Sequence, residues 1–257
     1  MAEMDKDTDD KLPFTAHLEE LRKRLITSFI AVAVGFAICY GFKEKLFQIL
    51  TQPLISVMNQ GETLIYTGLP EAFFTFLKVS FLAGLMLASP VIIYQFWMFV
   101  APGLYDREKR LLLPIVFLST IFFVGGALFG YFIVFPFGFD FFLGFATETI
   151  RPMPSMKEYL SFSSKLLLAF GLVFELPLVI TFLARLGIVS VPFLKKNRKY
   201  AILLFFVGAA ILTPPDVVTQ MMMALPLMLL YEISIVGARI FGKPKAAPQE
   251  DAEPASE

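Results

Sequence analysis

Residues 94–110, YQFWMFVAPGLYDREKR, form a polar connection between two long apolar runs, and the interpretation of the whole chain starts from this pattern. The first run covers residues 72–99 and is interrupted mainly by Lys78; the second covers residues 111–139. Apolar runs of about 18 or more residues indicate membrane-spanning helices. Because a basic connection between two spans favours the cytoplasmic side, we predict a short cytoplasmic loop whose carboxylates are open to cytosolic cations.

The composition indicates a membrane protein that crosses the bilayer several times. Apolar residues make up 57% of the chain, against roughly 45–50% in soluble domains. The single cysteine, Cys39, excludes an intrachain disulfide. No cleavable signal peptide is expected, because the first residues are acidic rather than basic and then apolar. We find no metal-ligand cluster, phosphate-binding loop or nucleophile motif, which argues against an enzyme or a resident cofactor.

The apolar runs predict an all-α fold with six transmembrane helices. A helix with one apolar face is expected over residues 14–24, with Thr15 as its cap. Short helices on the outer membrane face are expected within residues 46–58, broken at Pro53. A second outer loop is expected over residues 140–159. The predicted spans are 25–42, 72–99, 111–139, 160–186, 200–212 and 217–236, the fourth of them kinked near Pro177.

The last two spans are predicted to be short. Residues 200–212 would reach only about 20 Å as a helix, against a hydrocarbon core of about 30 Å. Two interpretations stay open: two short spans that thin the bilayer, or one re-entrant hairpin. In both interpretations, the chain returns to the side of the membrane on which residues 200–212 begin.

The charge distribution predicts that both termini lie in the cytoplasm. Sixteen of the 22 Lys and Arg residues lie in segments that this topology places inside, which follows the positive-inside rule. The six others are Lys43, Lys45, Lys78, Arg151, Lys157 and Lys165. We expect a membrane domain over residues 14–239, between an acidic disordered segment, 1–13, and a disordered cytoplasmic tail, 240–257.

Three glutamates are candidates for function. Glu20 and Glu108 each precede a span and lie among basic residues, so ion pairs with their own neighbours, such as Glu20 with Arg24, are the simplest interpretation. Glu175 lies within a span, where an ionisable side chain is costly and is a functional candidate by default. His17, the single histidine, is more readily explained by packing near the membrane face than by proton relay.

Several stretches, in this order and at these spacings, resemble the TatC family, the core subunit of the twin-arginine protein translocase. They are F-x-x-H-L-x-E-L-R-x-R from Phe14, Pro53-Leu54, Y-Q-x-W-x-F-x-x-P-G-L-Y-x-x-E from Tyr94, Y-L-S-F with F-G-x-x-F-E-L-P up to Pro177, and L-T-P-P-D up to Asp216. They cover nearly the whole chain outside its acidic termini. Lys165 departs from the uncharged residue expected in the family.

The resemblance implies a receptor for signal peptides with two consecutive arginines, in the bacterial inner membrane. Folded cargo would cross with two single-span partners, TatA and TatB, driven by the proton-motive force, and the complex would contain several copies. Signal-peptide binding is expected at Glu20, Glu108, Phe99, His17, Leu21 and Arg22. Groove or partner contacts are expected at Glu175, Pro53, Thr213, Asp216 and Gln220. Neither a cofactor nor nucleic acid is implied.

Two other classes of membrane protein, a secondary transporter and an intramembrane protease, are alternatives on the basis of the residues. A secondary transporter for a small cationic solute would explain Glu175, but the two halves of the chain show no convincing repeat. An intramembrane protease would need paired aspartates, or a serine with a histidine, at membrane depth. Asp140 and Asp216 instead lie at predicted span ends, and His17 is isolated.

Overall fold

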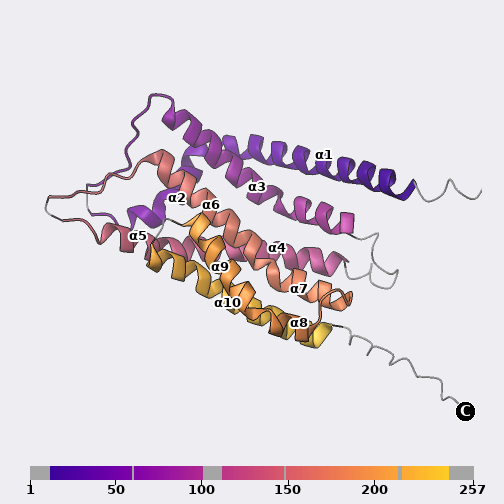
Figure 1. Cartoon of the computed structure of the whole chain (residues 1–257). Coiled ribbons are helices and arrows are strands. Elements are labelled where there is room, and N and C mark those ends of the chain that lie inside the picture. Colours follow the sequence, from indigo (N-terminus) through magenta and orange to yellow (C-terminus); the bar gives the residue numbers. More distant parts are fainter. Residues whose placement is uncertain (1–11, 60, 101–111, 148, 214–215, 243–257) are drawn as a thin grey trace, which may run out of the picture. The chain divides into compact units, whose positions relative to one another are not determined.

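The computed structural model describes residues 12–59, 61–100, 112–147, 149–213 and 216–242. Over these ranges every regular secondary-structure element is a helix (Figure 1). The β pairing in the same ranges is one isolated bridge, between Ile65 and Ser155. The prediction of an all-helical protein is therefore confirmed. The chain divides after Phe174 into two compact units. Of the segments predicted to be disordered, 1–13 and 240–257, residues 1–11 and 243–257 lie outside the described residues. The prediction was wrong for residues 12–13 and 240–241, which belong to the first and last helices.

Helices α1 (Leu12–Tyr40) and α3 (Glu71–Val100) pack side by side in the first unit (Figure 1). Their backbones approach most closely at two glycines. A Cβ added to Gly35 would lie 2.5 Å from the carbonyl oxygen of Gly84, and one added to Gly84 would lie 2.5 Å from the nitrogen of Phe36. Only glycine fits at such distances, so these two residues determine how near the two spans can lie.

Helix α1 is one continuous helix through the predicted segments 14–24 and 25–42, ending at Tyr40. The prediction that Thr15 caps a helix was wrong, because the helix already begins at Leu12 and Thr15 lies inside it. Pro13 is compatible with this earlier start, since a proline is tolerated in the first turn, where its missing N–H has no helical acceptor.

Helix α2 (Lys43–Ile55) contains Pro53 inside its last turn and is not broken there, which corrects the prediction. Pro53 has no N–H to donate to the carbonyl of Ile49, four residues earlier. The hydroxyl of Tyr131 donates to that carbonyl instead, over 2.6 Å, and the hydroxyl of Tyr159 donates to the next one, Leu50. The buried Pro53 thus contributes to how α2 is held against the helices of the first unit.

The third span is longer than predicted. It consists of α4 (Leu112–Phe129), a π-helical turn, η3 (Gly130–Val134), and α5 (Phe135–Leu143). The π turn ends two residues before Pro136, and the N–H of Phe135 bonds to the carbonyl of Gly130, five residues back. A proline prevents regular bonding over the preceding turn, and the wider turn allows the helix to continue. The predicted loop over 140–159 therefore shrinks, because α6 (Met156–Phe174) begins at Met156.

The loops at one end of the first unit are joined by Glu71, the first residue of α3. Its Oε2 accepts from the backbone N–H groups of Thr67 and Gly68 over 2.9 and 3.2 Å. Its Oε1 accepts from the hydroxyl of Ser155 and the N–H of Lys157, each over 3.0 Å. Both oxygens are thus occupied by the chain's own donors, and the loop before α3 is attached to the start of α6.

The second unit begins at Glu175, where the regular helix is interrupted for one residue before α7 (Leu176–Arg185). Pro177 explains the interruption, as the sequence predicted, because it cannot donate to a carbonyl of the preceding turn. Helix α8 (Val191–Lys196) follows within the basic segment, capped by the hydroxyl of Ser190. Glu175 itself is half-buried.

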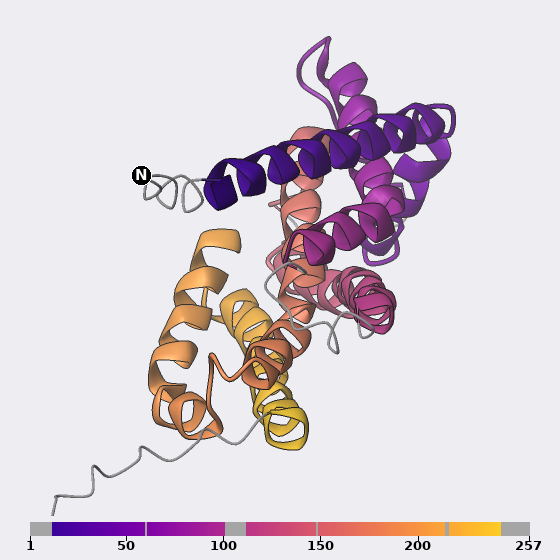
Figure 2. The ribbon, with the colours of Figure 1, turned by 90° about the vertical axis from the view of Figure 1, so that its right-hand side faces the viewer.

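Helices α9 (Arg198–Leu212) and α10 (Val217–Phe241) lie next to each other, and α10 also packs on α7 (Figures 1 and 2). At 15 residues, α9 is about 22 Å long, as short as predicted. The prediction that α10 is also short was wrong: its 25 residues reach about 37 Å. Pro226 is accommodated inside it and does not end it.

Five of the described segments are long and apolar enough to cross a membrane: Thr15–Tyr40, Glu71–Val100, Leu113–Leu143, Met156–Arg185 and Val217–Phe241. Helix α9 corresponds to the fifth predicted span, 200–212, and falls short of the length of a regular span. The chain is thus a multi-pass membrane protein.

Candidate functional site

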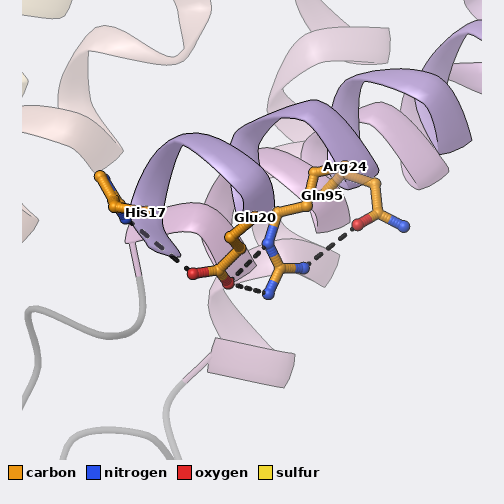
Figure 3. A network of polar contacts seen from close by, with 4 residues as sticks. All are labelled: His17, Glu20, Arg24 and Gln95. Atoms are coloured by element: carbon orange, nitrogen blue, oxygen red, sulfur yellow. Dashed lines mark hydrogen bonds and ion pairs between the residues drawn. The ribbon is translucent and has the colours of Figure 1, made fainter. Parts of the chain in front are cut away.

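A polar cluster lies where the first turns of α1 meet the last turns of α3, and consists of His17, Glu20, Arg24 and Gln95 (Figure 3). The guanidinium of Arg24 donates from Nε and a terminal nitrogen to Oε1 of Glu20, over 2.9 and 2.5 Å. Its other terminal nitrogen donates to the side-chain oxygen of Gln95 over 3.2 Å. The expected local pair of Glu20 with Arg24 is therefore confirmed, and it also connects α1 to α3.

The two oxygens of Glu20 differ. Oε1 receives both donors of Arg24, whereas Oε2 accepts no hydrogen bond from any residue that the structure describes. Nδ1 of His17 lies 3.9 Å from this oxygen. The side chain of Glu20 is 30% exposed. The carboxylate is thus oriented by its own chain while one oxygen still has acceptor capacity.

An aromatic pair lies beside this carboxylate. The ring of His17 stacks on the ring of Phe99, with centroids 4.2 Å apart and planes 17° apart. Phe99 is half-buried near the end of α3, while His17 is 46% exposed. The interpretation of His17 as a packing residue is confirmed by this contact. The structure therefore brings together three of the predicted site residues, His17, Glu20 and Phe99.

The other residues predicted for this site are not part of the polar cluster or the aromatic pair. Leu21 and Arg22 are exposed on α1, and no described residue forms a hydrogen bond or ion pair with Arg22. Glu108 lies outside the described residues, so its distance from Glu20 stays a prediction. Gln95 was not predicted, although it lies within residues 94–110; an uncharged amide in an apolar run carries no signal that it will meet Arg24.

The polar residues around the α9–α10 connection bond within their own unit. The hydroxyl of Thr213 donates to the carbonyl of Ala209 over 2.9 Å, and Asp216 caps α10 by accepting from the N–H of Thr219 over 2.7 Å. The amide of Gln220 donates to the carbonyl of Phe206 over 3.0 Å. These contacts terminate α9, begin α10 and hold the two helices together.

Within the described ranges, no group of three or more His, Cys, Asp or Glu side chains could hold a metal ion. The chemistry that the polar cluster supports is the binding of a cation. A carboxylate oriented by Arg24, beside the stacked rings of His17 and Phe99, suits a planar guanidinium, which bonds to carboxylates and stacks on aromatic faces.

The fold and the polar cluster define a multi-pass, all-helical membrane protein with a carboxylate suited to binding a cation, and comparison with known proteins identifies the family. The family model for the Sec-independent protein translocase protein TatC matches residues 16–226. The chain belongs to the TatC family. It is a translocase component and not an enzyme.

Curated relatives cover nearly the whole chain. The TatC protein of Desulforapulum autotrophicum is 69% identical over 244 residues, 95% of this chain and 90% of the relative. The TatC protein of Escherichia coli K12 is 41% identical over 233 residues, 91% of this chain and 90% of the relative. A crystal structure of the twin-arginine translocase receptor TatC is 44% identical, with a TM-score of 0.79, over 88% of this chain and 99% of the solved chain. The transporter and protease hypotheses are therefore set aside.

Proposed function

We propose that this protein is the receptor and core subunit for signal peptides with two consecutive arginines, and that Glu20 binds one of the two guanidinium groups. A solved relative is a twin-arginine translocase receptor. The observation that carries the assignment to a site is the partly exposed carboxylate of Glu20, whose Oε2 accepts no hydrogen bond from the described residues while Arg24 holds Oε1.

The neighbours of Glu20 support discrimination between arginine and lysine. A guanidinium is planar and can stack on the rings of His17 and Phe99 while it donates to Oε2. An ammonium has no planar face and is more strongly hydrated. Leu21 and Arg22, exposed on the same helix, are proposed to border the bound peptide.

The second arginine needs a second carboxylate, and Glu108 is our candidate. It follows the end of α3 by eight residues in the sequence, and the last full turn of α3 carries Phe99. Charge-assisted hydrogen bonds each contribute about 1.5–3 kcal/mol. Two of them give selectivity rather than tight binding, so apolar contacts of the signal peptide are proposed to supply the remainder.

Transport is proposed to need TatA and TatB, several copies of this chain and the proton-motive force, in the cytoplasmic membrane. The α9–α10 pair is a candidate surface for the partner helices, since Leu204 and Ile211 of α9 and Val217 of α10 are largely exposed. In this proposal Thr213, Asp216 and Gln220 act by holding that pair in shape. Glu175 and Pro53 are proposed to act in the membrane groove.

The test of the receptor site is binding of a fluorescent twin-arginine peptide to the purified protein in nanodiscs, next to a twin-lysine peptide. We expect Glu20→Ala and Glu108→Ala each to weaken arginine-peptide binding about tenfold or more. Glu19→Ala is the matched control, because Glu19 precedes Glu20 and pairs with Lys23 over 2.8 Å on the exposed face of α1. Equal loss in Glu19→Ala, or equal binding of both peptides, would refute the assignment.

The test of the partner surface is site-specific crosslinking to TatA and TatB from positions on α9 and α10. We expect Glu175→Ala to reduce both transport and crosslinking while binding of the signal peptide to detergent-purified protein is kept. Wild-type transport together with wild-type crosslinking in this variant would remove Glu175 from the proposal.

A further inference from the structure

A cavity of about 260 Å³ between α3 and α6 contains two lysines that the proposed receptor function does not use. Lys78 of α3 and Lys165 of α6 both line it, together with the hydroxyl residues Ser161 and Ser164. The rest of its lining is apolar, from Leu and Phe side chains of the same two helices. Two cationic groups and two hydroxyl donors thus share one hollow with apolar walls.

Both lysines lie inside segments that cross the membrane. Helix α3 is 30 residues long, about 45 Å, and Lys78 is seven residues, about 10 Å, from its first residue. The span that begins with α6 is also 30 residues long, and Lys165 is about 13 Å from its start. When such a span is centred on a hydrocarbon core of about 30 Å, the core begins about 7 Å from each end. The lysines therefore lie a few ångströms below the hydrocarbon boundary.

The charges of these lysines are not compensated by the residues that the structure describes. Neither ammonium forms a hydrogen bond or ion pair with any residue that the structure describes. The nearby Glu71, at the start of α3, is fully engaged by the loop donors Thr67, Gly68, Ser155 and Lys157. Uncompensated charges at this depth are costly, and two like charges on one cavity add repulsion. An anion bound between them would remove both costs.

We propose that this cavity binds the phosphate group of an anionic phospholipid in the outer leaflet. A phosphate has several acceptor oxygens, enough for two ammonium groups and the Ser161 and Ser164 hydroxyls. Lysine stems can extend from this depth toward the level of the headgroups, which is where a membrane supplies phosphate. The apolar walls fit the first part of an acyl chain. A carboxylate on a partner's transmembrane helix is the competing occupant, and the lipid is favoured because the lysine stems can reach from this depth to the level of the headgroups.

The experiment measures lipid retention by the purified full-length chain. The protein is delipidated, mixed in detergent with equal amounts of dioleoylphosphatidylglycerol and dioleoylphosphatidylcholine, and examined by native mass spectrometry. We expect preferential retention of phosphatidylglycerol. Lys78→Gln and Lys165→Gln should each weaken it about fivefold, and the double variant roughly twentyfold. The double substitution to arginine should keep the preference.

Lys45→Gln is the matched control, because Lys45 is an exposed lysine of α2 outside the cavity and its substitution removes the same charge. Thermal unfolding identifies any variant that is misfolded. The double substitution to arginine keeps both positive charges, so it distinguishes the effect of losing charge from the effect of misfolding. Equal retention of both lipids by the wild type, or wild-type retention by the double variant, would overturn the proposal.

Two further outcomes would also overturn it. Stabilisation of lipid-free protein by inorganic phosphate, without any by phosphatidylglycerol, would assign the cavity to the free anion. Loss of TatA or TatB co-purification in the double variant, with lipid retention unchanged, would assign it to a partner carboxylate.

Discussion

Glu71 and Glu20 are carboxylates near opposite ends of α3 in space, and they are bonded in different ways. Both oxygens of Glu71 accept from groups of its own chain, including the backbone N–H groups of Thr67, Gly68 and Lys157. Glu20 has one oxygen occupied by Arg24 and the other without a hydrogen bond from the described residues. A saturated carboxylate stabilises the fold, whereas an oriented and half-satisfied carboxylate can bind a ligand.

The largest expected effect is on stability, from Glu71→Ala. This change removes the acceptor of donors in two separate loops and at the start of α6, so we expect the melting temperature in detergent to fall by roughly 5 °C or more. Binding of the signal peptide below the transition should stay unchanged. The matched control is Glu62→Ala, because Asn59, in the same connection, is the only described residue from which the Glu62 carboxylate accepts hydrogen bonds. Equal melting of the two variants would contradict the structural role of Glu71.

The next effect concerns the aromatic side of the Glu20 site. We expect His17→Ala to weaken binding of a twin-arginine peptide by about two- to tenfold, because the ring stacked on Phe99 is lost. His17→Phe should retain most of the binding, since it keeps the stacked ring. Peptide titrations of both variants in nanodiscs measure this, and His17→Ala at wild-type affinity would show that the stack does not contribute.

Ionic strength should have a smaller effect than the His17 substitution, and it should affect the role of Glu20 in peptide binding more than the role of Glu71 in stability. Glu20 is partly exposed, so its attraction for a guanidinium is screened as ionic strength rises. We expect peptide affinity to fall a few-fold between about 0.05 and 0.5 M salt. The difference in melting temperature between wild type and Glu71→Ala, which reflects short hydrogen bonds, should change little. Salt-independent peptide binding would argue that apolar contacts carry the whole affinity.

The smallest effect is expected at Gln95, which holds one arm of Arg24. We expect Gln95→Ala to weaken peptide binding about twofold, because the released guanidinium can shield Oε2 of Glu20. Gln95→Glu should have the opposite sign, since a carboxylate there draws Arg24 away from Glu20. Peptide titrations of the two variants should therefore bracket the wild-type affinity, and a shift of both in one direction would contradict this role of Arg24.

Local sequence patterns were sufficient to predict one ion pair of the site and one interruption of a helix. The pair of Glu20 with Arg24 follows from spacing of four on a helix, and the interruption at Glu175 follows from Pro177. Predictions from local patterns were wrong where a residue distant in the sequence formed a hydrogen bond to the helix. Pro53 does not break α2, because hydroxyls of Tyr131 and Tyr159 bond to carbonyls of that helix. The third span runs four residues beyond its predicted end at residue 139, and a π turn accommodates Pro136 within it.

By itself, the sequence determined the all-helical membrane class, the order of the apolar segments and the family, because these depend on hydropathy, spacing and motifs along the chain. Only the tertiary structure decided which carboxylate is saturated and which is open, that His17 stacks on Phe99, and that Lys78 and Lys165 share one cavity. The physical reason is that hydrogen-bond satisfaction and charge compensation depend on neighbours in space. Residues 71 and 155, or 78 and 165, are far apart in the sequence, and their meeting depends on how α3 and α6 pack.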